Sequence, residues 1–156
     1  MADISHIIRG VLIQVAKARL LLPNAAIAEV LSYAPPEPVA DAPDWLLGRI
    51  RWRGWRLPLV SFSRYAQLAE EQGGLGSKVI VLKALGGDTK HPYFAVLTQG
   101  FPRLVTVTDA ALTRLDEGEK LPGGVLSQVR LNQDDAIVPD LAELEASLRD
   151  VLADAA

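Results

Sequence analysis

Short apolar runs, each ended by glycine, proline or polar residues, limit what this chain can fold into. Runs of this length predict strands more readily than helices. Helical spacing is clear in few places, so the sequence predicts a mainly β fold built from small barrels or a sandwich. The expected strands cover residues 10–15, 20–22, 27–33, 47–52, 55–60, 78–85, 92–98, 104–108, 124–131 and 136–138.

Two of these runs, 47–52 and 55–60, meet at Arg53-Gly54. Glycine suits the positive φ that a tight hairpin turn requires. The segment therefore predicts a β-hairpin with Arg53 and Gly54 at its tip. Pro58 lacks a backbone N–H, which places it at a sheet edge or where no donor is needed.

The segment 34–43 holds four prolines in ten residues. This density excludes a helix or a central strand and predicts an extended surface loop. We expect the loop to lie within one domain, because neither flank looks able to fold alone. A second interruption at 71–77 is rich in glycine and predicts a flexible break that divides the chain nearly in half.

Four segments carry helical or turn signals. Residues 61–71 predict a short helix with Ser61 or Ser63 as N-cap, and 108–116 predict a short helix or turn capped by Thr108 or Asp109. From Asp140 onward the apolar residues recur at helical spacing, which predicts a C-terminal helix with Asp140 as N-cap. Its apolar positions are Leu141, Leu144, Leu148, Val151 and Leu152. Residues 132–135 predict a polar turn between the last strands.

Composition narrows the class of protein. Cysteine is absent, which excludes disulfides, thiolate zinc sites and cysteine nucleophiles. The net charge of −3 lacks the broad basic excess of a dedicated nucleic-acid binder. No apolar stretch is long enough to span a bilayer, and residues 1–9 lack a secretory pattern. We expect a cytoplasmic protein with no direct membrane insertion.

The sequence contains no strong catalytic, metal-binding or phosphate-binding motif. His6 and His91 are the only histidines, and neither has a second metal ligand at a convincing spacing. Residues 73–78 loosely resemble a phosphate loop, but serine precedes the lysine and a strand follows. We therefore expect no enzyme, no cofactor and no metal. A pocket that brought His6 or His91 into hydrogen-bond reach of Asp109 or Asp116 would favour a small enzyme instead.

Arginine and tryptophan cluster between residues 45 and 56. The members of this Arg/Trp strip are Trp45, Arg49, Arg51, Trp52, Arg53, Trp55 and Arg56. Such a strip on a β surface could stack bases and neutralise phosphates, as in an SH3- or OB-like nucleic-acid-binding module. Alternatively, the tryptophans are core residues and the arginines pair with nearby acids. A third interpretation is a protein interface, in which both residue types are common anchors.

Several segments in order resemble the CheW family of chemotaxis adaptors. The residues that carry the resemblance are Leu22-Pro23, Ile27-Ala28-Glu29-Val30-Leu31, the proline-rich loop, Gly48-Arg49-Ile50-Arg51-Trp52-Arg53-Gly54 and Leu57-Pro58-Leu59-Val60. The ending is also similar, through 124–126 and 136–144. The resemblance implies a single CheW-like domain over 1–156 with two SH3-like β-barrel subdomains and a C-terminal helix. The first barrel would come mainly from 17–72, the second mainly from 1–16 and 78–156.

The resemblance also implies a function. CheW-like adaptors are non-catalytic and couple the cytoplasmic tip of methyl-accepting chemoreceptors to a CheA-type histidine kinase. By position, receptor contacts would fall on Ile27, Gly48, Val79 and Ile80, whereas kinase contacts would fall on Arg53, Gly54 and Glu29, with Glu29 facing Arg53 as an ion pair. Such a protein would be a monomer when alone and would be recruited to receptor arrays.

This chain departs from the family pattern at several places. Arg51 and Trp52 stand where the family has asparagine and leucine, and Ser61 stands where it has aspartate. Residues 97–100 replace a Val-Asp-x-Val segment. These differences suggest a divergent paralogue, similar to the accessory adaptors of type IV pilus chemosensory systems.

Overall fold

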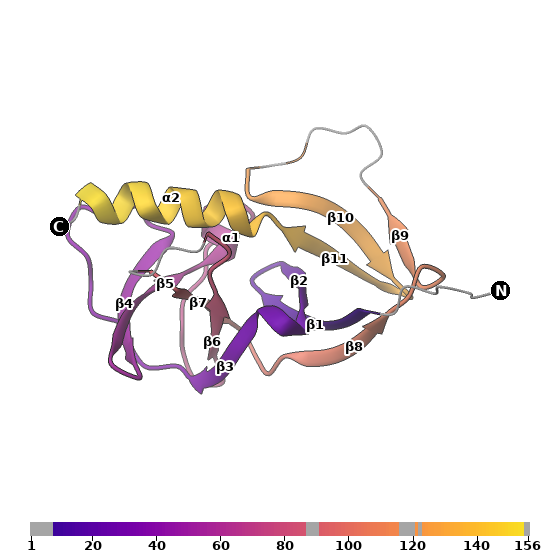
Figure 1. Cartoon of the computed structure of the whole chain (residues 1–156), viewed down its shortest axis with the longest axis horizontal. Coiled ribbons are helices and arrows are strands. Elements are labelled where there is room, and N and C mark those ends of the chain that lie inside the picture. The colour runs from indigo at the N-terminus through magenta and orange to yellow at the C-terminus, as the bar shows by residue number, and fades with distance from the viewer. Residues whose placement is uncertain (1–7, 87–90, 116–120, 122, 155–156) are drawn as a thin grey trace.

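The computed structural model describes residues 8–86, 91–115, 121 and 123–154, and these form two antiparallel-rich sheets with a C-terminal helix (Figure 1). The six-stranded sheet has the order β8 (Arg103–Val107), β1 (Ile8–Val15), β2 (Ala18–Pro23), β11 (Asp134–Pro139), β10 (Val125–Leu131) and β9 (Leu112–Arg114). The five-stranded sheet has the order β3 (Ile27–Ser32), β6 (Lys78–Lys83), β7 (Tyr93–Thr98), β5 (Trp55–Val60) and β4 (Leu46–Trp52). A 3₁₀ turn, Asn24–Ala26, joins β2 to β3.

The strands divide between the sheets differently from the ranges expected for the two barrels. β2 lies with β1, because the connection between Val15 and Ala18 is so short that the two strands must pair as a hairpin. β6 and β7 lie with the earlier strands β3 and β5, and the pairing Leu59↔Ala95 is parallel. The glycine-rich segment 71–77 therefore connects strands of one sheet and does not separate the two barrels.

Strand alternation explains why the sheets share a core. Successive side chains of a strand point to opposite faces, so Val11 and Ile13 face one apolar cluster while Leu12 faces another. The cluster around Leu12 belongs to the six-stranded sheet, which we call the second barrel. The five-stranded sheet, the first barrel, has its own interior around Leu59 and Trp52. The largest cluster lies between the barrels and contains residues from both.

The C-terminal helix α2 (Leu141–Asp154) covers this shared core (Figure 1). Asp140 Oδ1 accepts a hydrogen bond from Glu143 N at 3.0 Å, which confirms the expected N-cap. Leu144 and Leu148 are 1% and 4% exposed and pack into the shared cluster. Within the residues that the structure describes, no helix is long and apolar enough to cross a membrane.

The expected helix over 61–71 is much shorter. Helix α1 spans only Phe62–Tyr65, with Ser61 as N-cap through a 3.2 Å bond from Arg64 N to Ser61 Oγ. The helix ends early because Gln67 adopts a φ of 58°, outside the right-handed helical region. The chain then runs to Glu71, whose side chain is 3% exposed.

Two further local predictions need correction. Residues 109–111 form a turn in which Thr108 Oγ1 accepts from Ala111 N at 3.2 Å, but the chain then enters β9, which pairs with β10. A short helix there would have left the β10 edge without its partner. The polar turn near the end is Asn132-Gln133 alone, since Asp134 already pairs with Leu131 across the hairpin.

Candidate functional site

The hairpin between β4 and β5 has the tip expected from the sequence. Arg53 and Gly54 have φ angles of 49° and 83°, and Trp52 pairs with Trp55 on either side of them. Positive φ at both central residues is what a type I′ turn requires, and this turn matches the natural twist of paired strands. Arginine is an unusual residue at such a position, since asparagine and glycine adopt this conformation at lower cost.

Arg53 and Glu29 form the ion pair expected from the resemblance. Arg53 Nη2 lies 2.7 Å from Glu29 Oε1, and the guanidinium carbon lies 5.0 Å from the centre of the Trp52 ring. Glu29 is on β3, and Arg53 directly follows β4; these strands are the two edges of the first barrel. The pair therefore links both edges at one end of the barrel. The Arg53 side chain is 69% exposed, so the pair contributes only about 0–1 kcal/mol to stability.

Glu37 makes a second set of contacts with β4. Its backbone exchanges two hydrogen bonds with Arg49, at 2.9 and 2.8 Å, which attaches the proline-rich loop to the strand edge. Its carboxylate lies 2.8 Å from Arg56 Nη2 and 3.8 Å from Arg51 Nη2. Gly48 permits this approach, because a Cβ at its φ of 147° would collide with the Glu37 carbonyl oxygen.

Most members of the Arg/Trp strip are either packed tryptophans or arginines paired with a glutamate. Trp52 is 7% exposed and packs edge-on against Tyr93 with 4.9 Å between ring centres. Trp45 packs in the same manner against Tyr65 at 4.9 Å, whereas Trp55 is exposed. The arginines at 51, 53 and 56 each face a glutamate. A nucleic-acid phosphate would have to displace these carboxylates, and only one indole is available for stacking a base.

The expected receptor-contact residues do not form one exposed patch. Val79 and Ile80 are 2% and 0% exposed, and they face the first-barrel interior and the shared core respectively. Ile27 pairs with Leu82 near the other end of β6. Val79 lines the floor of an opening between the edge strands β3 and β4. This opening has a volume of about 220 Å³ and is lined also by Leu31, Ser32, Ala34, Pro35, Glu37, Arg49, Ile50 and Arg51.

Glu71 is a structural residue that the sequence did not reveal. Its side chain is 3% exposed and accepts hydrogen bonds from Ala16 N at 2.8 Å, Ser61 Oγ at 2.6 Å and Gln99 Nε2 at 3.1 Å. Ala16 belongs to the second barrel, while Ser61 and Gln99 adjoin strands of the first. The carboxylate therefore joins the barrels. Its position beside a glycine-rich stretch gave no signal of burial.

The segment 71–77, where a flexible break was expected, is held by contacts at both ends, while Leu75 and Gly76 at its tip are exposed. Ser77 Oγ accepts from Gly74 N at 3.0 Å and donates to Gln99 Oε1 at 3.1 Å. A Cβ on Gly73 would overlap the Tyr33 ring, so the backbone lies directly against that side chain. Glycine at 73 thus serves close packing rather than freedom of movement.

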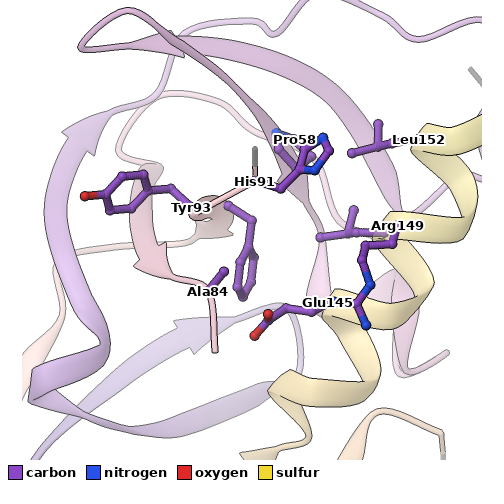
Figure 2. Close-up of a pocket in the computed structure, with 9 residues that line it drawn as sticks. Pro58, Ala84, His91, Tyr93, Glu145, Arg149 and Leu152 are labelled. Carbon is purple, nitrogen blue, oxygen red and sulfur yellow. The ribbon is translucent and has the colours of Figure 1, made fainter. Parts of the chain in front are cut away.

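His91 lies in a cavity between α2 and the first barrel (Figure 2). The cavity is mostly apolar, lined by Pro58, Ala84, Tyr93, Phe94, Leu148 and Leu152 in addition to Glu145 and Arg149. Glu145 accepts from the backbone N–H of Leu85 at 2.8 Å and of Gly86 at 3.0 Å, so its two oxygens already hold the loop after β6. This carboxylate stabilises structure and is poorly placed to act as a base.

Other expected chemistry falls partly outside the described residues, since His6 and Asp116 lie there. Among the residues that the structure does describe, no three His, Asp or Glu side chains are grouped as a metal site would need. Burial raises the pKa of the Tyr65 hydroxyl, and a hydrogen bond with Ser147 opposes that shift. Tyr65 also packs against Trp45 and Phe62, so we interpret it as a core residue.

Two small barrels that share a core and carry a C-terminal helix define a mainly β, two-barrel domain. The chain belongs to the CheW-like domain family, whose sequence model matches residues 9–148. Among solved structures, the scaffolding protein TtCheW from Thermoanaerobacter tengcongensis superposes with a TM-score of 0.72 at 13% identity, covering 90% of this chain and 89% of that chain. A search of curated proteins gave no match.

These comparisons confirm the family and the fold expected from the sequence. The family match covers almost the whole described chain, and the structural match confirms two barrels with a C-terminal helix. Proteins of this family are non-catalytic scaffolds of chemotaxis signalling, so the chain is a scaffold rather than an enzyme.

Proposed function

We propose that this protein is a cytoplasmic adaptor that couples methyl-accepting chemoreceptors to a CheA-type histidine kinase at receptor arrays. The observation that carries the proposal is the Glu29–Arg53 pair at the hairpin tip, with its 2.7 Å contact. An exposed pair of this kind adds little stability, and arginine is costly at a φ of 49°. A residue that is unfavourable for the turn yet held by a carboxylate and an aromatic ring is best explained by recognition.

Kinase binding is assigned to Arg53, Gly54 and Glu29. The Arg53 guanidinium uses one nitrogen for Glu29 and lies over the Trp52 ring, which fixes the direction of its remaining N–H donors. A partner that supplies a carboxylate or backbone carbonyls at this tip would bind a preorganised donor array. Electrostatic contacts of this type favour specificity and association rate more than raw affinity.

Receptor binding is assigned to Ile27, Gly48, Val79 and Ile80, of which only Ile27 is partly exposed. Ile27 is half-buried, whereas the buried Val79 and Ile80 would act by shaping the surface rather than by large side-chain contacts. Val79 reaches the opening between β3 and β4. An apolar helical segment of the receptor tip would bury Ile27 and the rim of that opening.

A nucleic-acid-binding role for the Arg/Trp strip finds no support in its geometry. Arg51, Arg53 and Arg56 are matched by carboxylates, and Trp52 is buried. We therefore propose no nucleic-acid partner.

The departures at Arg51, Trp52 and Ser61 lead us to propose that the kinase belongs to a type IV pilus chemosensory system.

The proposal is tested with Arg53→Asn in a reconstituted assembly of receptor cytoplasmic domain, CheA-type kinase and the adaptor. Asparagine tolerates the positive φ, so the turn is kept while the ion pair is lost. We expect near-native thermal stability but strongly reduced kinase capture and activation. Lys83→Gln, which removes another exposed cation, is the matched control and should behave as wild type.

Unchanged kinase coupling by Arg53→Asn would contradict the assignment of the hairpin tip. Failure of the wild-type adaptor to capture either the kinase or the receptor would contradict the adaptor function as a whole. Replacing Ile27 by serine separates the two surfaces, because receptor capture should fall while kinase capture is retained. Capture by pilus-associated but not flagellar kinases would support the narrower assignment.

A further inference from the structure

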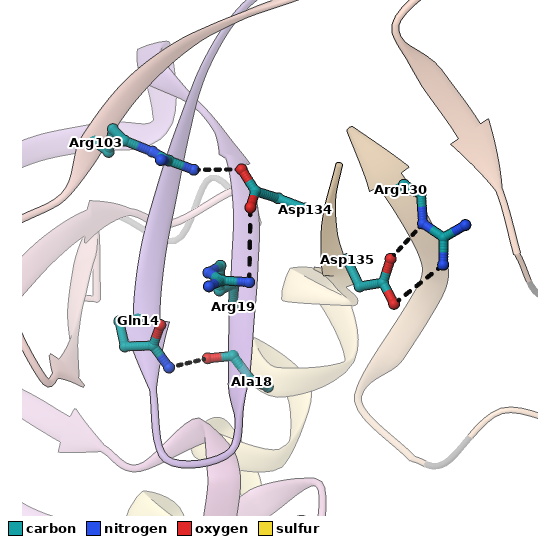
Figure 3. A network of polar contacts seen from close by, with 7 residues as sticks. All are labelled: Gln14, Ala18, Arg19, Arg103, Arg130, Asp134 and Asp135. Atoms are coloured by element: carbon teal, nitrogen blue, oxygen red, sulfur yellow. Dashed lines mark hydrogen bonds and ion pairs between the residues drawn. The ribbon is translucent and has the colours of Figure 1, made fainter. Parts of the chain in front are cut away.

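Cations from distant parts of the sequence converge on an opening of the second barrel. Lys17 from the β1–β2 turn and Arg19 from β2 line the opening, and Arg103 from β8 and Arg130 from β10 lie beside it (Figure 3 shows the three arginines). The opening has a volume of about 430 Å³ and is lined by Gln14, Lys17, Ala18, Arg19, Leu115, Gln128, Val129, Asp135, Ala136 and Ile137. We call this feature the second-barrel mouth.

Strand pairing explains why the mouth exists. In the described chain, β2 and β11 are paired in parallel only at Ile137↔Leu20. The strands are therefore free to diverge beside that pair, and Arg19 and Asp135 line the space between them. Gln14 Nε2 donates to the carbonyls of Val15 at 2.8 Å and Ala18 at 3.1 Å, which fixes the hairpin that carries the cations.

The charges around the mouth are only partly matched. Asp134 is shared by Arg103 at 2.7 Å and Arg19 at 3.9 Å, and Asp135 is engaged by Arg130 at 2.7 Å (Figure 3). Lys17 makes no ion pair with any residue that the structure describes. The lining of the mouth itself holds two cations, Lys17 and Arg19, and one carboxylate, Asp135. Cations therefore outnumber carboxylates in the lining by one, on a protein whose net charge is −3.

Lys17 lies in the two-residue turn between Val15 and Ala18, and such a turn requires a positive φ. Its φ is 62°, a conformation that favours glycine or asparagine, at the rim of the mouth. Arg19 is 45% exposed and its only described carboxylate contact is long, at 3.9 Å. Both cations can therefore take a new anionic partner without losing a short ion pair.

We propose that the second-barrel mouth docks an acidic segment of a partner polypeptide, whose carboxylates pair with Lys17 and Arg19. Nucleic acid fits less well, because Asp135 lines the mouth and Asp134 lies beside Arg19, and both would repel a continuous phosphate backbone. A flexible acidic chain can place its carboxylates on the cations and avoid both aspartates. This inference does not depend on the proposed adaptor function, because the hairpin tip and the mouth belong to different barrels.

The experiment measures binding of a fluorescein-labelled hexaglutamate peptide to the full chain by fluorescence anisotropy at low salt. Lys17→Asn combined with Arg19→Gln should weaken binding about tenfold, a loss that two weak charge contacts can supply. Asparagine suits the φ of Lys17, so the variant should fold, which circular dichroism checks. Arg9→Gln combined with Lys83→Gln removes the same net charge elsewhere and should bind as wild type.

Several outcomes would overturn the inference. The first is that the wild-type protein does not bind the peptide, and the second is that both double variants lose peptide affinity equally. The third is that millimolar inorganic phosphate displaces the peptide, which would indicate a small-anion site. Displacement by an equimolar oligothymidylate would assign the mouth to nucleic acid instead. Selective loss in the Lys17/Arg19 variant, together with weaker binding at higher salt, would support the acidic segment.

Discussion

Two glutamates of this chain make hydrogen bonds of similar length with opposite consequences. Glu71 is almost fully buried and accepts from three donors, so its removal would leave buried groups without partners. Glu29 lies in an exposed pair with Arg53, where water can replace the contact. Burial, rather than bond length, therefore decides which carboxylate holds the fold and which is available for recognition.

We expect Glu71→Ala to lower the free energy of unfolding by about 3 kcal/mol, because Ala16 N and the buried Ser61 hydroxyl lose their acceptor. Urea denaturation followed by circular dichroism measures the effect. Glu70→Ala is the matched control, since this neighbouring side chain is 84% exposed and should cost less than about 0.5 kcal/mol. Equal stability of the two variants would contradict the role given to Glu71.

A titratable pair on the β10–β11 hairpin gives a residue-scale prediction about pH. The hydrogen bond from Arg130 holds the pKa of Asp135 below its ordinary value. A depressed pKa in the folded state means that the stabilising contribution is present above the unfolded pKa and is lost as pH falls through the folded one. In Arg130→Gln the Asp135 pKa should rise toward its ordinary value, as carbon-detected NMR titration would show. An unchanged titration would mean that the pair does not persist in solution.

At the scale of elements, the edge of β4 depends on one glycine. Gly48 lets the Glu37 backbone approach Arg49 closely enough for two hydrogen bonds. The proline-rich loop is thereby attached to the hairpin that carries Arg53. Loop, strand edge and hairpin tip thus form one connected unit of the first barrel.

Replacing Gly48 by alanine should detach this loop. The new methyl group would collide with the Glu37 carbonyl oxygen, and the φ of 147° at position 48 is strained for any L-residue. We expect a loss of about 2 kcal/mol in thermal or urea unfolding, together with loss of amide protection at Glu37 and Arg49. Gly74→Ala is the control, because a Cβ there meets nothing within 4 Å and no strained φ is involved. Retained protection at both amides would contradict this account.

At the scale of the whole molecule, the central cluster unites the barrels. It contains Val11 and Ile13 from one sheet, Ile80 and Leu82 from the other, and Leu144 from the helix. Neither of the two barrels can unfold without exposing this shared apolar surface. We therefore expect the two sheets to unfold as one cooperative unit.

Leu144→Ala tests this cooperativity. The side chain is 1% exposed, so the substitution should cost about 2–5 kcal/mol. Hydrogen exchange by NMR should show the slowest amides of β1, β6 and β10 losing the same free energy. Leu126→Ala, at a 56% exposed site, should change little. Destabilisation confined to one sheet would mean that the barrels fold independently.

Local sequence patterns determined much of this protein. The apolar runs located most strands, the pair Arg53-Gly54 predicted the hairpin tip, and Asp140 predicted the helix start. These features depend on residues adjacent in the chain, through φ preference, side-chain alternation and end capping. The order of the motifs resembles that of the CheW family, and this resemblance predicted the two-barrel architecture. Local patterns alone could not predict it.

Only the tertiary structure decided which strands share a sheet and which polar residues matter. The pairing of β6 with β3 crosses the glycine-rich segment, and the burial of Glu71 depends on Ala16, Ser61 and Gln99 arriving from three separate places. The paired arginines of the strip and the cations of the second-barrel mouth likewise depend on contacts between distant residues. Sequence fixes what each residue prefers locally, whereas burial and charge neighbours arise from the packing of the complete chain.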